Sequence, residues 1–248
     1  MISRRRFVAA SSSGLLLTGC DRLTNNAQFR GVLRHAEKLT MASQRLVSSR
    51  DALAREYHEA DISPIFRSNG TAMPAGDDYA RHAAEGFSNW RLAVDGLVAT
   101  PLSIPMHILR SLPYRTQITR HDCVEGWSAI GKWHGVQLSR ILDRAGLSSK
   151  AKFIVFHCAD KIGGKPYYES IDLVDAFHPQ TILAWGMNGH LLPVKNGAPI
   201  RLRVERQLGY KQAKYIQRIE AIDSLDRAYG GKGGYWEDNA DYEWYAGV

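Results

Sequence analysis

Apolar residues recur at helical spacing near the N-terminus, with charged residues between them. They are Phe29, Val32, Leu33, Ala36, Leu39, Leu46, Leu53 and Tyr57. This pattern predicts a long amphipathic helix over residues 29–57, or two helices in line that meet at a bend near Ser48 and Ser49. We expect one apolar stripe of the helix to pack on the rest of the protein. Alternatively, the helix could act as a stalk between a lipid anchor and the domain.

Beyond Pro64 the apolar pattern takes the period of β-strands. Residues 90–94 alternate between apolar and polar side chains and end at a turn signal, Asp95-Gly96. Residues 153–156 form a short apolar run of the buried-strand type, and residues 200–204 alternate again. These segments predict short strands that are spread through the chain.

A helix is predicted over residues 136–146, where the apolar residues return to helical spacing and Gly146 provides a stop signal. Scattered strands with a few short helices, and no strand–helix–strand rhythm, predict an α+β fold of mixed sheets. No internal repeat or low-complexity linker divides the chain. We therefore predict one domain over residues 61–248, preceded by a helical segment over residues 21–60.

The first twenty residues have the features of an export signal. Arg4 and Arg5 precede a weakly apolar run over residues 9–19, which is too short to span a bilayer. The pattern resembles a twin-arginine signal, and Leu17-Thr18-Gly19-Cys20 resembles a bacterial lipobox. We predict a signal over residues 1–20, a periplasmic protein exported by the twin-arginine route, and a lipid anchor on Cys20 that holds it at a membrane surface. A disordered basic terminus is the alternative.

Composition excludes some functions and fits one sizeable domain. The 248 residues carry a formal net charge of +7, which falls to +4 when the three arginines of the first twenty residues are removed. This mild basic charge is distributed along the chain, so it does not indicate a nucleic-acid groove. A hydrophobic content of 44% suits a domain with a proper core.

Cysteine chemistry is concentrated around Cys123, which follows His121 and Asp122 and precedes a Trp-Ser pair. From the residues alone, Cys123 could be a nucleophile, a metal ligand or a packed core residue. It could also form a disulfide with Cys158 in an oxidising compartment. A zinc site that also uses His121, His157 and Cys158 has suitable ligand types but poor spacing.

The cysteine segment, residues 118–130, resembles the cysteine loop of the sulfite oxidase-type molybdenum enzymes. It is most similar to the branch of the periplasmic methionine sulfoxide reductases, whose loop reads Cys-Val-Glu-x-Trp-Ser. Residues 66–74 resemble the family's Arg-Asn-His-x-x-x-Pro loop, and residues 196–202 resemble its Asn/His-Gly-Ala-Pro-x-Arg motif. Residues 209–214 resemble the Gly-x-Lys-x-x-Lys segment that closes over the pterin phosphate. These motifs follow one another in the family's order.

The resemblance implies a molybdenum-molybdopterin cofactor with Cys123 as the metal ligand, since soft thiolates suit molybdenum. It also implies that a set of residues contacts the pterin: Asn69, Cys158, Asn196, Arg201, Gln212, Ala213 and Lys214. Arginine and lysine suit the phosphate, and asparagine amides can pair with ring nitrogens. For Gln212 and Ala213 the family largely uses backbone contacts. For Cys158, packing and cofactor contact are equally open.

The implied activity is transfer of an oxygen atom to or from a small S- or N-oxide. Trp127, Ser128 and Ser68 stand where sulfite oxidases use arginines around the cofactor, which disfavours anionic sulfite. No Cys-x-x-Cys-His motif for covalent haem is present, so electrons are expected from a separate partner such as a membrane b-type cytochrome. We expect a monomer. The alternative is a membrane-anchored lipoprotein that retains the fold and is non-catalytic or binds zinc.

The C-terminal segment, residues 229–245, is rich in glycine and then in aromatic residues. It follows no clear strand and opens no helix, so it is not a phosphate-binding loop. We expect its aromatic side chains to pin the segment to the core, and a surface for a partner is the alternative.

Overall fold

The computed structural model describes residues 27–248, with the backbone alone for residues 27–35. The predicted signal and lipobox lie outside these residues. The chain divides into two units, one ending at Ser49 and one formed by Arg50–Val248, and each is described by itself. Within the described residues, no helix combines the length and apolar character needed to cross a membrane.

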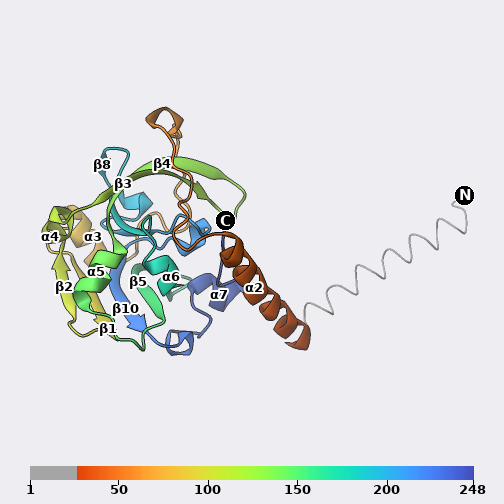
Figure 1. Ribbon diagram of the computed structural model, residues 1–248. Helices are drawn as coiled ribbons and strands as arrows, with labels where there is room; N and C mark the ends of the chain where they lie inside the picture. The colour runs from red at the N-terminus through yellow and green to blue at the C-terminus, as the bar shows by residue number, and fades with distance from the viewer. Residues whose placement is uncertain (1–26) are drawn as a thin grey trace, which may run out of the picture. The chain divides into compact units, whose positions relative to one another are not determined.

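The first unit contains helix α2, Ala27–Val47 (Figure 1). The prediction that this helix continues to Tyr57 is wrong, because the chain leaves the helix at Ser48 and then runs extended. In the second unit, Tyr57 N donates to Ile118 O at 2.9 Å, and Ala54 N donates to the side chain of Gln180 at 2.8 Å. The backbone groups of this segment are therefore satisfied by partners far along the sequence rather than by helical bonds.

The second unit contains two sheets. The first has the order β2-β1-β10-β5-β6, in which β1 and β10 are parallel and the other neighbours are antiparallel. Its strands are β1 (Arg91–Gly96), β2 (Leu102–Pro105), β5 (Phe153–Ile162), β6 (Lys165–Asp172) and β10 (Ile216–Ile222). The predicted strand before the Asp95-Gly96 turn is confirmed as β1. Gly96 has a φ of 83°, a left-handed conformation that favours glycine.

The second sheet has the order β3-β4-β7-β8, and β9 pairs with β7. Its strands are β3 (Arg115–Asp122), β4 (Ser128–Gln137), β7 (Ile182–Met187), β8 (His190–Leu191) and β9 (Arg201–Arg203). Figure 1 shows β3, β4 and β8 at the end of the unit opposite to β1 and β10. The loop between β3 and β4 begins with Cys123, so the hairpin presents the cysteine at a strand end.

Short helices connect and cover the sheets. The α-helices are α3 (Asp77–Ala84), α4 (Met106–Ser111), α5 (Leu138–Ala145), α6 (Leu173–Ala176) and α7 (Tyr235–Ala240), and the 3₁₀ turns are η1 (Glu59–Asp61), η2 (Val194–Asn196), η3 (Gly209–Lys211) and η4 (Leu225–Arg227). The predicted helix before Gly146 is confirmed as α5, and Gly146 caps it in the left-handed conformation. Mixed sheets with short helices confirm the predicted α+β fold.

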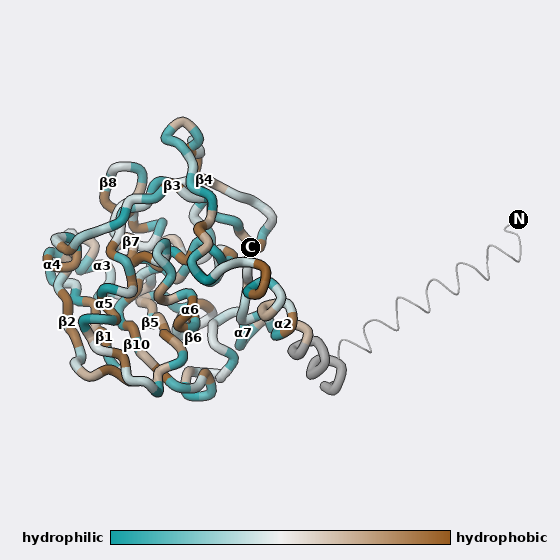
Figure 2. The backbone as a smooth tube through the Cα atoms, in the orientation of Figure 1, coloured by the Kyte–Doolittle hydropathy of each residue, from teal (hydrophilic) through white to brown (hydrophobic). Residues whose placement is uncertain are grey.

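The main hydrophobic core lies on the first sheet, and Figure 2 shows hydrophobic segments along β2, β5 and β10. Helix α5 contributes the fully buried Leu138, Ile141 and Leu142 to this core. A smaller cluster around Trp133 packs on the second sheet. The two sheets thus form the rigid support for the loops that leave their ends.

Candidate active site

A cavity of about 550 Å³ lies where the cysteine loop meets five other segments. These are the loop that contains Asn69, the hairpin of β5 and β6, strand β9 with Arg201, η3 with the residues after it, and the C-terminal segment. The lining residues are Asn69, Gly70, Thr71, Cys123, Val124, Glu125, Asp160, Lys161, Ile162, Gly163, Tyr167, Arg201, Gly209, Tyr210, Gln212, Lys214, Trp236 and Tyr242. Six segments of the chain therefore build one concave site.

Cys123 lies in the wall of this cavity and is 6% exposed. The amide Nδ2 of Asn69 lies 3.3 Å from its sulfur and donates to it. Burial raises the pKa of the Cys123 thiol, against the opposing effect of hydrogen bonds from the Glu125 backbone and Asn69. A bound metal cation reverses this balance and favours the thiolate.

The tip of the cysteine loop is open to solvent. Val124 is 46% exposed and lines the cavity together with Glu125. The Glu125 carboxylate accepts a hydrogen bond from Trp127 Nε1 at 3.0 Å, which fixes its direction. Arg67 is exposed and is not among the lining residues. The polar groups beside the cysteine are therefore an amide and a carboxylate.

Two cations, the buried Arg201 and the half-buried Lys214, lie in the cavity wall and bond to backbone carbonyls. Arg201 Nη1 donates to Asn196 O at 3.0 Å, and Lys214 Nζ donates to Asn69 O at 2.8 Å and to Lys195 O at 3.2 Å. Burial, followed by the neighbouring Arg203, lowers the pKa of Arg201 to about 9. Burial, followed by Arg201, lowers the pKa of Lys214 to about 8. Both cations would gain from an anionic ligand.

Five of the eight predicted site residues line the cavity, namely Asn69, Cys123, Arg201, Gln212 and Lys214. Asn196 is 3% exposed behind Arg201, and its side-chain nitrogen has no partner within the described chain. Ala213 is buried in the core, and its carbonyl accepts from Leu202 N at 2.8 Å.

Cys158 also lies in the main core, and its sulfur is 3.8 Å from Phe156 O. The residues of strand β5 that reach the cavity are Asp160, Lys161 and Ile162, which follow Cys158 toward the end of the strand. The predicted cofactor contact of Cys158 therefore has no support from the lining of the cavity, and this role stays a prediction from the resemblance.

The two structural alternatives for the cysteines lack support. Cys123 and Cys158 are both free thiols. His157 and Cys158 are adjacent on β5 and so point to opposite faces of the sheet. His157 instead bonds to Tyr229 and Glu220 at 2.8 and 2.9 Å. Within the described residues, no group of three or more His, Cys, Asp or Glu side chains is placed to hold a metal ion.

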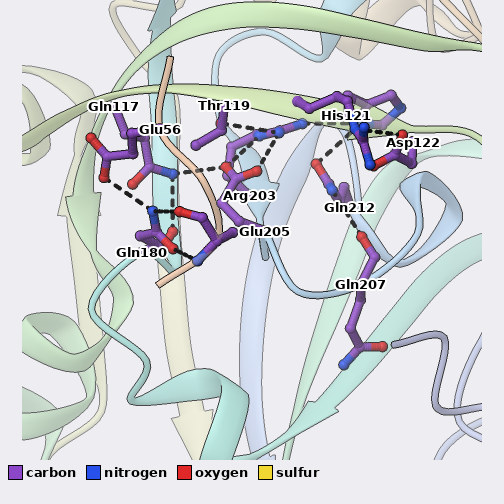
Figure 3. Close-up of polar contacts among 12 residues, drawn as sticks. Glu56, Gln117, Thr119, His121, Asp122, Gln180, Arg203, Glu205, Gln207 and Gln212 are labelled. Atoms are coloured by element: carbon purple, nitrogen blue, oxygen red, sulfur yellow. Dashed lines mark hydrogen bonds and ion pairs between the residues drawn. The ribbon is translucent and has the colours of Figure 1, made fainter. Parts of the chain in front are cut away.

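Sequence reasoning missed a buried polar network beneath the cysteine loop (Figure 3). The alternation over residues 200–204 suggested a half-buried strand, yet Arg201, Arg203 and Glu205 are all at most 5% exposed. Arg203 forms an ion pair with Glu205 at 2.6 Å and reaches His121 at 3.0 Å. The available signal was the placement of opposite charges two residues apart, at Arg203 at the end of β9 and at Glu205 in the turn that follows.

The C-terminal aromatic residues pack on the domain as predicted, and they also line the cavity. The rings of Trp236 and Tyr242 stack with centroids 5.7 Å apart, and Tyr210 meets Tyr242 at 5.1 Å. Trp236 and Tyr242 are both lining residues. The C-terminal segment therefore supplies an aromatic part of the cavity wall.

The donor set of this cavity fits a molybdopterin. A thiol stands in the wall, and two cations with lowered pKa values are placed for a phosphate. Three buried donors lack partners within the described part of the chain: Arg201 Nε, Asn196 Nδ2 and His121 Nε2. Buried polar atoms are normally satisfied, and of these three residues Arg201 lines the cavity, so its unpaired Nε fits a polar ligand there. The fold and the site thus define a pterin-binding redox protein.

Comparisons with known proteins agree. The family model described as the oxidoreductase molybdopterin binding domain matches residues 80–229. The putative protein-methionine-sulfoxide reductase subunit YedZ1 of Azospira oryzae is 38% identical over 248 residues, which cover 99% of this chain and 88% of the relative. This protein belongs to the molybdopterin-binding oxidoreductase family. It is an oxidoreductase whose cofactor is molybdenum-molybdopterin.

Two further proteins are similar over part of their length. The protein-methionine-sulfoxide reductase catalytic subunit MsrP of Campylobacter jejuni is 34% identical over 174 residues, covering 64% of this chain and 57% of the relative. The structure of the sulfane dehydrogenase SoxCD of Paracoccus pantotrophus superposes with a TM-score of 0.50 at 24% identity. This alignment covers 55% of this chain and 39% of the other, and it supports the sulfite oxidase-type fold alone.

Proposed function

We propose that this protein reduces a sulfoxide, with methionine sulfoxide in polypeptides as the substrate, and that Cys123 is the protein ligand of the molybdenum. The observation that supports this proposal best is the chemistry around the thiol, where Asn69 and Glu125 are the polar neighbours. A carboxylate at this position repels an anion such as sulfite. A neutral sulfoxide is free of that repulsion.

The pterin would be held by the residues that carry unpaired donors and cationic charge. Arg201 and Lys214 suit the phosphate, and Asn196 and Gln212 offer amides to the ring system. Asn69 has a separate part, because its amide donates to the Cys123 sulfur and stabilises negative charge there. When bound, the cofactor supplies a metal that changes its oxidation state by two electrons and exchanges an oxygen atom.

A polypeptide substrate is supported by the shape of the entrance and by the names of the relatives. The cysteine loop projects to the surface, and Met73 beside the Asn69 loop is 48% exposed. The wall of Trp236 and Tyr242 offers aromatic rings to a sulfur-bearing side chain. Reduction of a sulfoxide consumes two electrons and two protons and releases a sulfide and water.

The test is activity of the full-length protein, produced in a host that makes the cofactor. We expect near-stoichiometric molybdenum by elemental analysis. With a reduced dye as electron donor, we expect faster turnover on a substrate polypeptide that contains methionine sulfoxide than on an N-oxide. Cys123→Ser is expected to lose both, whereas Cys158→Ser keeps the metal because its sulfur does not line the cavity. Sulfite oxidation as the fastest reaction, or molybdenum retained in Cys123→Ser, would overturn the proposal.

We further propose that electrons come from a separate membrane-associated carrier and that the protein acts in the periplasm as a lipid-anchored monomer. Support comes from the Arg4-Arg5 pair, the segment that ends at Cys20 and the lack of a covalent haem motif in the sequence. Cell fractionation with labelled fatty acid, compared between the natural protein and Cys20→Ala, tests the anchor. Recovery of both proteins in the soluble fraction without label would contradict it.

A further inference from the structure

Tyr215 is a fully buried residue with an unusual backbone conformation. It stands immediately before β10, and its φ of 56° is uncommon for a residue other than glycine. Two backbone hydrogen bonds hold it in this conformation, since Tyr215 N donates to Gly197 O at 3.2 Å and Tyr215 O accepts from Ala159 N at 2.9 Å. Strained backbone of this kind is concentrated at functional sites. It fixes the direction in which the side chain of Tyr215 leaves the backbone.

The side chain of Tyr215 reaches the loop that carries Asn69. Its hydroxyl donates to Thr71 O at 2.7 Å. Burial, followed by the charge of Asp160, raises the pKa of Tyr215, so the hydroxyl keeps its hydrogen and remains a donor. The ring meets Tyr79 edge-to-face with centroids 5.4 Å apart, and this contact restricts its movement. The hydroxyl of Tyr215 is therefore a fixed donor directed at one backbone carbonyl.

Tyr215 also contacts the other donor that holds this loop, the ammonium group of Lys214. The Lys214 Nζ lies 5.1 Å from the centroid of the Tyr215 ring, within the range of a cation–π contact. The same Nζ donates to Asn69 O at 2.8 Å and also to Thr71 O. Tyr215 thus acts on both ends of the segment 69–71, on Thr71 through its hydroxyl and on Asn69 through the Lys214 ammonium that its ring contacts.

Asn69 is the residue of this loop whose side chain reaches the thiol. Its Nδ2 donates to Cys123 Sγ at 3.3 Å. Gly70 stands between Asn69 and Thr71 with a φ of 63°, a left-handed conformation that turns the chain at this point. The segment 69–71 belongs to neither sheet and to no helix, so strand pairing does not fix it. The direction of the Asn69 amide therefore depends on the donors that hold the carbonyls of residues 69 and 71.

We propose that Tyr215 is a positioning residue: its hydroxyl holds Thr71 O so that the Asn69 amide stays on the Cys123 sulfur and tunes the reduction potential of the bound metal. Hydrogen bonds to a ligand sulfur withdraw electron density from it and help to set such potentials. Tyr215 is not among the residues that line the cavity, so it acts only through the loop. The inference rests on the proposed role of Cys123 as the metal ligand and not on the sulfoxide substrate.

The first experiment is a redox titration of the purified holoprotein, followed by the electron paramagnetic resonance of the metal. Tyr215→Phe keeps the ring and removes only the hydroxyl. We expect its midpoint potential to move to more negative values, because an Asn69 amide that is no longer held withdraws less charge from the sulfur. The matched control is Tyr168→Phe, which removes the hydroxyl of another buried tyrosine, bonded to Asp238 at 2.5 Å, and should keep the wild-type potential. An unchanged potential in Tyr215→Phe would overturn the proposal.

A double variant tests whether Tyr215 acts through Asn69. Asn69→Ala removes the amide, and we expect it to shift the potential in the same direction and by more than Tyr215→Phe. Adding Tyr215→Phe to Asn69→Ala should then produce no further shift, because two changes in one chain of contacts are not additive. An equal shift in both backgrounds would refute the positioning role, since Tyr215 would then affect the metal without the amide.

Crystal structures give a readout that needs no Asn69 variant. In Tyr215→Phe we expect the hydrogen bond from Asn69 Nδ2 to Cys123 Sγ to be lost, and an intact bond would contradict the proposal. The wild-type holoprotein must keep both this bond and the one from Tyr215 to Thr71 O, and the absence of either refutes the inference even if the variant does not fold. Molybdenum retained in Cys123→Ser would refute the ligand role of Cys123 instead. A metal that Cys123 does bind, with the same potential in Tyr215→Phe, refutes this inference alone.

Discussion

Lys211 lies between two buried carboxylates, and we predict that replacing it with methionine strongly destabilises the fold. Its Nζ is 2.8 Å from Glu169 and is hydrogen-bonded to Glu237. Each of the three side chains is at most 1% exposed. Lys211 belongs to the segment that resembles the family's Gly-x-Lys-x-x-Lys motif, and its ammonium group is buried between these two carboxylates. Lys211→Met leaves two buried acids without the cation that lies between them.

Removing one partner from a buried ion pair costs about 3–5 kcal/mol. In a domain of this size each kcal/mol lowers Tm by about 2–4 °C, so we expect a loss of about 10 °C. The assay is thermal unfolding followed by circular dichroism, on proteins matched for molybdenum content. Lys232→Met is the matched control, because Lys232 pairs with Asp241 on the surface and should change Tm by less than about 2 °C.

The same cluster predicts a pH dependence. Burial raises the pKa of Glu169 well above its ordinary 4.5, against the attraction of Lys211. The pKa of Glu169 is therefore higher in the folded protein than in the unfolded chain, so protonation of Glu169 stabilises the fold. This stabilisation is complete below about pH 4.5 and is lost as the pH rises through the folded-state pKa. Glu169→Gln mimics the protonated acid and should flatten this dependence. A Lys211→Met protein with wild-type Tm at every pH would refute the reasoning about all three residues.

Three further predictions concern packing and local stability. Leu142→Ala, at a fully buried position of α5, should lower the free energy of unfolding in urea by about 2–5 kcal/mol, and a loss under 1 kcal/mol would contradict the described core. Gly234→Ala should cost about 1–3 kcal/mol by the same measurement, because its Cβ would overlap the carboxylate of Glu237 although its φ of −167° suits any residue. Burial lowers the pKa of His178 below 6.5, so the stability that its neutral ring gives to residues 50–57 through Ala52 O is present above pH 6.5 and lost as pH falls through the folded pKa. Hydrogen exchange of residues 50–57 should accelerate at acid pH in the natural protein, and an equal acceleration in His178→Gln would exclude this histidine as the cause.

Local patterns predicted the elements whose structure is decided locally. The helix before Gly146 and the strand before the Asp95-Gly96 turn have both periodicity and a stop signal within a few residues. The sequence motifs also identified the cavity, because Cys123, Asn69 and Lys214 come from loops with distinctive short patterns. Each of these features can be read without knowing which distant segment lies beside it.

The features that were missed depend on pairing between distant segments. Residues 52–57 continue the apolar spacing of α2, but partners on β3 and at Gln180 offer their backbone an alternative to the helix. Asp160 and Tyr167 reach the cavity only because of the register of β5 and β6. Nothing within either strand indicates which face will meet the cysteine loop.

The distribution of charge in the cavity connects the missed residues to the proposed function. Arg201 is buried and Lys214 is half-buried, and both bond to carbonyl oxygens. Burial and a neighbouring arginine lower the pKa of each, and a nearby anion would oppose this effect. In the proposed function, an anionic phosphate on the cofactor would compensate this charge, so we assign these cations to the cofactor rather than to the substrate. Near the Cys123 thiol, the Glu125 carboxylate places negative charge in the same cavity. On this proposal, one cavity would bind an anionic cofactor through these cations and would favour a neutral oxide beside the thiol.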